Sequence, residues 1–210
     1  MTNDYTFPFD TCEEKKDYIA QPYSAFLNLV NCFIIIHFLN KSTNINNFNL
    51  LLSILAFELF HVLSHTIHIK GKIQTNITHM LAYIINYTFL ILFINLTKVM
   101  PSNLFIYILG FLISLDIYAF INLDVVYFIV TQSIIFLMPL FYYYSLLPIH
   151  IQNAIIQIFI YIVIIIILFI NEKKNCKEIL EKYNKFPLHT LIEFTGILLF
   201  YTISSNFYNL

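Results

Sequence analysis

The chain of 210 residues is 59% hydrophobic and only 11% charged, and its formal net charge is −1. Soluble domains carry roughly 25% charged residues, so this composition excludes an ordinary water-facing globular surface. The abundance of Phe, Ile and Leu excludes a disordered chain, and the absence of a basic stripe argues against a nucleic-acid partner. An integral membrane protein remains.

Apolar runs long enough to cross a bilayer, at about 20 residues per helix, follow one another along the whole chain. They are too long for barrel strands and lack their period-two alternation, so helices are favoured. The sequence predicts an all-α, seven-transmembrane-helix bundle that forms a single domain over 1–210, with a polar N-terminal segment (1–22) and a polar loop between the last two helices (171–187). The predicted spans are 23–39, 48–69, 77–97, 103–121, 124–146, 152–170 and 188–207.

An odd number of spans places the two ends of the chain on opposite sides of the membrane. We call the side of the N-terminal segment face A and the other side face B. Nine of the 11 basic residues, all of them lysines, belong to face A. By the positive-inside rule this distribution favours a cytoplasmic face A.

Ionisable side chains gather in the second span, in the run FELFHVLSHTIH. Glu58, His61, His65 and His68 fall within an arc of about 80° on a helix, and Ser64 lies in the same turn as His65. Such a face is costly in hydrocarbon, so it must point into the bundle.

Further polar residues of the spans lie at the same depth. His79 opens the third span, His189 opens the seventh, and Glu193 follows His189 by one turn. Asp116 lies near the face A end of the fourth span. The topology therefore predicts that these side chains and those of the second span converge near face A, whereas the remaining two histidines fall towards face B.

Imidazole and carboxylate groups at this spacing favour a divalent metal ion, with zinc first. Three protein ligands leave a position for water, whose pKa zinc lowers to about 7, and a nearby carboxylate can orient a ligand or act as the base. Facing histidines could instead hold haem, or the cluster could serve packing alone. Asp116 suits packing as well as catalysis, and a lone helical serine such as Ser64 often bonds to its own backbone. The candidate metal ligands are His61, His65, His68, His189 and Glu193.

Three segments together resemble the alkaline ceramidase family, a group of seven-helix membrane metal hydrolases related to the adiponectin-type receptors. The first is Asp10-Thr-Cys12-Glu13 with Asn28 and Asn31 downstream, the second is Ser64-x-x-x-His68 with His79 beyond it, and the third is His189-x-x-x-Glu193 followed by Thr195-Gly196. The resemblance implies a zinc-dependent enzyme that hydrolyses the amide bond of ceramide or a similar membrane lipid.

Carried over to this chain, the resemblance implies His68 and His189 as zinc ligands and Ser64 as the residue that stabilises the oxyanion. Glu193 stands where the family has a further histidine, and a carboxylate can replace it, as in His₂Glu sites. His79 stands where the family has its Asp, so Glu58 or Asp116 would have to act as the base. A ligand set of His61, His65 and His189 remains an alternative.

The family also has a calcium site near its N-terminus, which Asp10 and Glu13 match in part. It further pairs cysteines placed like Cys12 and Cys176, and such a disulfide would make face A luminal. The lysine distribution favours the opposite orientation, so both remain open, and the endoplasmic reticulum or Golgi membrane is the expected location.

Three functions are therefore considered: a zinc-dependent hydrolase of lipid amides, a haem-binding electron carrier of the membrane, and a receptor-like protein that holds a metal without turnover. The sequence indicates no oligomeric state.

Overall fold

The computed structural model of the protein describes residue 13 and residues 19–67, 72–182 and 188–210. Within these ranges, seven helical stretches are long and apolar enough to cross a membrane, which confirms the predicted all-α, multi-pass bundle. The helices are α1 (Pro22–Leu39), α2 (Ile45–Thr66), α3 (Lys72–Tyr83), α4 (Ile85–Thr97), α5 (Asn103–Ile121), α6 (Val125–Tyr142), η1 (Tyr144–Leu146), α7 (Ile149–Lys182) and α8 (Leu188–Phe207).

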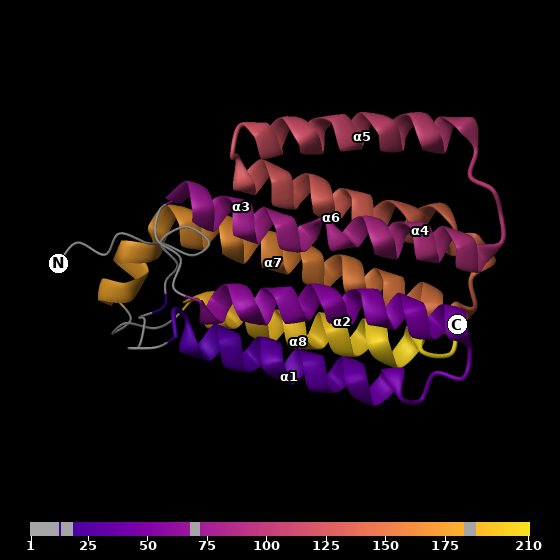
Figure 1. The fold of residues 1–210 in the computed structure, drawn as a ribbon, viewed down its shortest axis with the longest axis horizontal. Helices are drawn as coiled ribbons and strands as arrows, with labels where there is room; N and C mark the ends of the chain where they lie inside the picture. Colours follow the sequence, from indigo (N-terminus) through magenta and orange to yellow (C-terminus); the bar gives the residue numbers. More distant parts are fainter. Residues whose placement is uncertain (1–12, 14–18, 68–71, 183–187) are drawn as a thin grey trace.

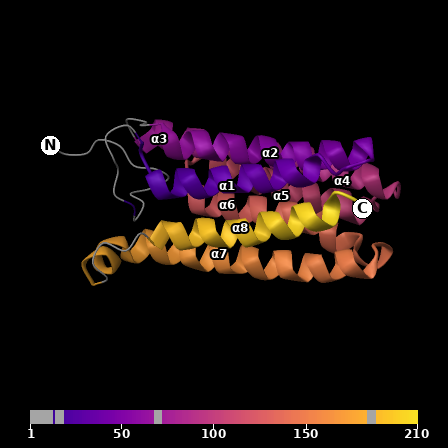
Figure 2. The ribbon, with the colours of Figure 1, turned by 90° about the horizontal axis from the view of Figure 1, so that it is seen from below.

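The helices run side by side along one axis, as Figures 1 and 2 show. Helix α1 packs against α2 and α8, α8 packs against α7, and α4 packs against α2 and α6. Helix α5 lies at the outer edge of the bundle, against α6 (Figure 1). The end of α2, the start of α3 and the start of α8 meet at the left of Figure 1, which is face A.

Side-chain caps explain where several helices begin. The first backbone N–H groups of a helix have no partner within it, and Asn, Ser and Asp side chains can accept from them. Asn44 accepts from the N–H of Asn46 before α2, at 2.9 Å. Ser102 caps α5 and Asp124 caps α6 in the same way.

Helix α1 is capped instead by a residue distant in sequence. Pro22, which has no N–H to satisfy, occupies the first turn. The Glu13 carboxylate accepts from the N–H of Tyr23 at 2.5 Å and from both the N–H and the hydroxyl of Ser24. Burial raises the pKa of Glu13 above its usual value, and these hydrogen bonds oppose that rise. Glu13 thereby caps the start of α1.

The third predicted span is divided into α3 and α4 by a break at Ile84. The N–H of Ile84 donates to Leu81 O and the N–H of Tyr87 donates to Ile84 O, at 3.3 and 3.1 Å. These tight i→i+3 bonds replace part of the α-helical ladder, without a proline or glycine in either helix.

The polar loop predicted over 171–187 is corrected over its first part, because α7 continues as helix to Lys182. This segment is rich in Glu and Lys, which are strong helix formers, and contains neither Gly nor Pro. The polarity of this segment does not mark the end of the helix, since a helix that leaves the membrane can continue into water.

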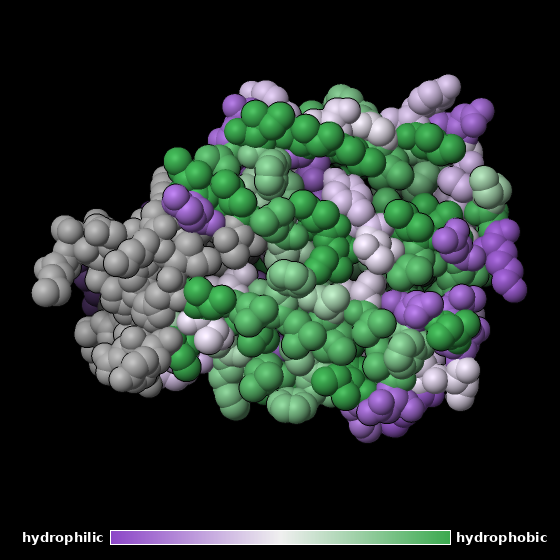
Figure 3. Space-filling view, in the orientation of Figure 1, coloured by the Kyte–Doolittle hydropathy of each residue, from purple (hydrophilic) through white to green (hydrophobic). Residues whose placement is uncertain are grey.

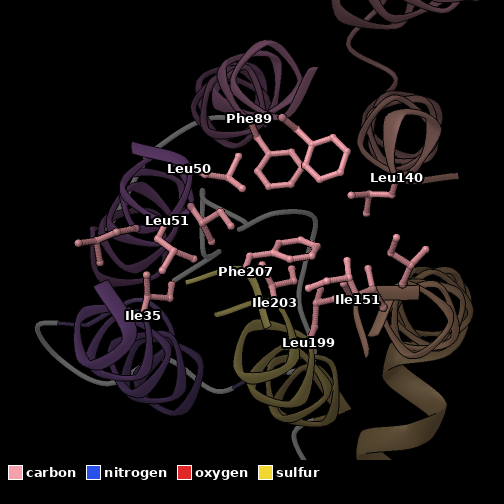
Figure 4. Packing of buried hydrophobic residues seen from close by; sticks show 14 of the residues in the cluster. Ile35, Leu50, Leu51, Phe89, Leu140, Ile151, Leu199, Ile203 and Phe207 are labelled. Atoms are coloured by element: carbon pink, nitrogen blue, oxygen red, sulfur yellow. The ribbon is translucent and has the colours of Figure 1, made fainter. Parts of the chain in front are cut away.

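Apolar side chains fill the centre of the bundle towards face B. Figure 4 shows them projecting inward from α1, α2, α4, α6, α7 and α8 around a common core. Figure 3 shows a hydrophobic band across the middle of the visible surface, with hydrophilic residues at the face B end. This distribution fits a bundle whose sides contact lipid and whose end contacts water.

Candidate metal centre

The last turns of α2 and the first turns of α8 bring two imidazoles to one carboxylate. Nε2 of His65 lies 3.1 Å from Glu193 Oε1, and Nε2 of His189 lies 3.0 Å from the same oxygen. All three residues are buried, with at most 3% of their surface exposed. Three groups able to bind a metal thus meet inside the face A half of the bundle.

The other ring nitrogen of each histidine is held by an oxygen acceptor. Nδ1 of His65 bonds to Oε1 of Gln21, whose own backbone N–H donates to His65 O at 2.9 Å. Nδ1 of His189 lies 2.8 Å from Oε2 of Glu172. Glu172 is the last residue of the apolar, membrane-spanning stretch of α7. Metal-binding histidines are commonly oriented by such acceptors.

These contacts define the protonation of the two rings. An amide oxygen and a carboxylate accept hydrogen bonds, so the proton of each neutral imidazole is on Nδ1 and its lone pair is on Nε2. Both lone pairs then approach an oxygen of Glu193 that is itself electron-rich. With these tautomers, a cation would relieve the contact: a metal ion among the three atoms or a second proton on an imidazole.

The two contacts with Glu193 can be compared with the ligand separations of a zinc site. Zinc–nitrogen and zinc–oxygen bonds of about 2.0–2.2 Å in a tetrahedral site place neighbouring ligand atoms about 3.3–3.5 Å apart. The observed separations of His65 and His189 from Glu193 are close to these values. His189 is not among the three residues whose ligand atoms all lie within 4.8 Å of one another, so its ring and that of His65 would have to approach each other to share an ion.

His61 and Glu58 extend the cluster one turn deeper into the membrane. His61, His65 and Glu193 each offer a ligand atom within 4.8 Å of the others, so His61 could replace or join His189 as a ligand. Glu58 is fully buried; its Oε1 lies 3.9 Å from Nδ1 of His61, and its Oε2 accepts from Asn31 at 3.3 Å. A carboxylate that could act as a base thus stands beside the candidate ligands.

A cavity of about 130 Å³ begins at this cluster. Glu58, His61 and Glu193 line its polar end. Apolar side chains from α2, α4, α6, α7 and α8 form most of its remaining walls, among them Ile54, Phe89, Phe136, Ile162 and Leu199. The site therefore has an apolar compartment attached to it.

The structure brings together most, but not all, of the predicted site residues. His61, His65, His189, Glu193 and Glu58 form one cluster. His68 lies outside the described residues, and so does the side chain of His79, although its backbone belongs to α3. The described ligand candidates on α2 are therefore His61 and His65.

Two predicted catalytic residues have other hydrogen-bond partners. The Ser64 hydroxyl donates to Phe60 O of its own helix at 2.9 Å, the ordinary arrangement of a helical serine. Asp116 accepts from side chains of α4 and α6, at 2.6–2.7 Å. Its partners are Tyr87, Thr131 and Gln132.

The predicted calcium and disulfide residues lie largely outside the described part of the chain. Asp10 and Cys12 are not described, nor is the side chain of Cys176. Glu13 is described, and its two oxygens face the start of α1, where they act as a helix cap.

Gln21 and Glu172 were not predicted from the sequence. Glu172 lies two residues past the predicted end of its span, where the apolar run gives way to charged residues. Gln21 stands next to Pro22 at the edge of the polar N-terminal segment. The one feature of the sequence that could have pointed to them is their position near face A, at the same depth in the membrane as the histidines.

The chain matches no known family model, no curated protein and no solved structure.

Proposed function

We propose that the protein is a zinc-dependent hydrolase that cleaves the amide bond of ceramide or a similar lipid amide within the membrane. The observation that carries this proposal is the approach of His65 Nε2 and His189 Nε2 to one oxygen of Glu193. Two imidazoles and one carboxylate are typical ligands of catalytic zinc in hydrolases, which keep a fourth position open.

The cavity supports a lipid as the substrate. Its polar end is next to the candidate ligands and its walls are mostly apolar, so an acyl chain could lie along them while the amide stays near Glu193. The sequence resemblance to alkaline ceramidases suggests ceramide as the first lipid to test, and the endoplasmic reticulum or Golgi as the first membrane.

Zinc bound at this site would polarise the amide carbonyl and make water a nucleophile near neutral pH. Glu58 is the proposed base, because it lines the cavity and Asn31 holds one of its oxygens. It takes a proton from the attacking water and passes it to the amide nitrogen. The carbon–nitrogen bond then breaks, and a fatty acid and an amine are released.

The geometry favours a metal ion over haem. Axial imidazoles of a haem face each other across a flat macrocycle. Here the Glu193 carboxylate lies within 3.1 Å of both His65 and His189. A receptor-like protein would keep the same metal ligands, so the measurement that separates it from an enzyme is turnover.

Metal analysis and lipid hydrolysis on the same purified samples test the proposal. In lipid nanodiscs, the wild type should hold about one zinc per chain and release fatty acid from ceramide. His189→Ala and Glu193→Gln should lose both properties. His37→Ala and His150→Ala are matched controls, because these histidines are exposed near the face B ends of α1 and α7.

Absence of zinc from the purified wild type, or full hydrolysis by His189→Ala, would contradict the proposal. A Soret band would favour the haem carrier. Zinc without fatty-acid release from any lipid amide would favour the receptor-like protein.

A further inference from the structure

The cavity beside the candidate metal centre extends along the bundle from a polar end to an apolar end. On α8 its walls run from Glu193 to Ile203, ten positions nearer face B. At a rise of about 1.5 Å per residue these positions are about 15 Å apart, half the thickness of the hydrocarbon core of a bilayer. On α2 the walls run in the same direction, from His61 back to Ser53. The cavity is therefore about as long as an acyl chain that fills one leaflet.

Two buried aromatic rings lie just beyond the apolar end of this cavity. Phe93 follows the wall residue Phe89 by one turn of α4, and their rings stack with 5.9 Å between centroids. Phe207 follows the wall residue Ile203 by one turn of α8, and its ring centroid lies 6.1 Å from that of Phe93. Both Phe93 and Phe207 are fully buried, and Figure 4 shows Phe207 projecting into the centre of the bundle. The pair Phe93–Phe207 thus forms a floor beneath the cavity.

The walls next to this floor suit hydrocarbon. Ile54, Phe89 and Leu199 present apolar side chains there. Ser53 lines the same region, but its hydroxyl donates to Leu50 O of its own helix at 2.7 Å. This end of the cavity therefore fits the methyl end of a chain, whereas the opposite end, at the candidate metal ligands, fits the amide.

We infer that the Phe93–Phe207 pair sets the longest acyl chain that the site accepts. This inference rests on the proposed hydrolase function, because it requires the amide to lie near Glu193. An acyl chain of about one leaflet in length reaches the floor. A longer chain has to displace a packed ring or withdraw its amide from Glu193, and closely packed interiors resist such displacement. The expected substrates are lipid amides with acyl chains up to about palmitoyl length.

Ceramides that differ only in their N-acyl chain (lauroyl, palmitoyl or lignoceroyl) test the inference in lipid nanodiscs. The wild type should hydrolyse the palmitoyl substrate in preference to the lignoceroyl one. Phe93→Ala removes part of the floor and should raise kcat/KM for the lignoceroyl substrate, relative to the palmitoyl one, about tenfold. Phe93→Leu should change this ratio in the same direction by less. Phe105→Ala is the matched control, because Phe105 is a buried ring of α5 that does not line the cavity.

A second variant narrows the cavity from within and leaves both rings in place. Ser53→Leu adds an apolar side chain to the wall next to the floor. It should lower kcat/KM for the palmitoyl substrate, relative to the lauroyl one, about tenfold, with zinc content unchanged. Ser114→Leu is its matched control, because Ser114 also bonds within its own helix, to Gly110 O at 2.9 Å, and is exposed on α5.

A third measurement does not depend on turnover. Palmitic acid that carries a photoreactive diazirine at its methyl end is bound to the wild type in nanodiscs and irradiated, and the labelled residues are mapped by mass spectrometry. The label should be found next to the floor, around Ser53, Phe89 and Ile203, and excess unlabelled palmitic acid should prevent it. Labelling around Glu58 and Glu193 instead would show that the chain lies the other way round, and would overturn the inference.

The remaining outcomes separate the inference from the proposed function. If the wild type and both kinds of variant hydrolyse all three ceramides with the same preference, the inference fails and the hydrolase function stands. If Phe93→Ala does not fold, Phe93→Leu and Ser53→Leu decide. If the wild type is labelled at the floor but hydrolyses no lipid amide, the proposed function fails and the floor remains the limit on the bound chain. If neither labelling nor hydrolysis occurs, both fail.

Discussion

We expect the contact between Glu172 and His189 to increase the affinity of the site for zinc. Oε2 of Glu172 lies 2.8 Å from Nδ1 of His189, and each residue is only 3% exposed. Glu172→Leu removes the acceptor that keeps the His189 proton on Nδ1. The ring is then free to rotate or to place its proton on Nε2, and either change takes the lone pair away from Glu193.

The expected loss follows from this hydrogen bond. A bond to a charged group contributes about 1.5–3 kcal/mol, and each 1.4 kcal/mol corresponds to about a tenfold change in affinity. Glu172→Leu should therefore weaken zinc binding about 10- to 100-fold, the range typical for residues that orient a metal ligand. Glu172→Gln keeps an oxygen acceptor but loses the charge, so its zinc affinity should lie between those of the wild type and Glu172→Leu.

Zinc affinity can be measured by competition between metal-free protein in nanodiscs and a chromophoric chelator. Glu178→Gln is the matched control, because Glu178 is exposed on the same helix, six positions further along, and should leave the affinity unchanged. Wild-type affinity in Glu172→Leu would refute the reasoning that Glu172 orients His189. An equal loss in Glu178→Gln would show that charge near face A matters rather than this contact.

Three further predictions concern the base, the bound metal and the Asp116 network. Glu58→Gln should keep zinc and lower hydrolysis about 10²–10⁴-fold, and retention of wild-type kcat would exclude Glu58 as the base. Removing zinc with a chelator should lower the wild-type free energy of unfolding by about 3 kcal/mol and leave His65→Ala unaffected, since a ligand stabilises only the state that binds it. An equal chelator effect on both proteins, in thermal unfolding, would contradict this. Asp116→Leu should destabilise the bundle by about 1–3 kcal/mol, because the half-buried Tyr87 hydroxyl and the buried Gln132 amide lose their acceptor, whereas Asp116→Asn should cost less. A thermal midpoint for Asp116→Leu equal to that of the wild type would show that the network contributes nothing.

The candidate site was predictable in outline because depth in a membrane can be counted along each span. His65 lies in the last turn of α2 and His189 in the first turn of α8, so both had to lie near face A once the spans were known. The distance of His65 from Glu193 was not predictable, since it depends on the rotation of α2 and α8 about their axes, whereas His189 and Glu193 lie one turn apart on α8. Rotation also decides that Asp116 bonds to α4 and α6, whereas the bond of Ser64 to Phe60 O lies within one helix.

The partners Gln21 and Glu172 illustrate what pattern alone leaves out. Each lies where a polar segment meets an apolar span. Gln21 bonds to a histidine 44 positions away, and Glu172 bonds to one 17 positions away. No local periodicity links such residues. The break at Ile84 is similar, because it occurs without the glycine or proline that normally marks one.

The sequence by itself determined that the protein is a multi-pass helical membrane protein with ionisable residues gathered near one face. It could do so because the length of an apolar run and the cost of a charge in hydrocarbon are properties of the chain itself. Only the tertiary structure decided which imidazole of α2 meets Glu193, which oxygens orient the two histidines and which side chains share their cavity. Those relations depend on contacts between helices that pack together from distant parts of the chain, so they arise only when the bundle has formed.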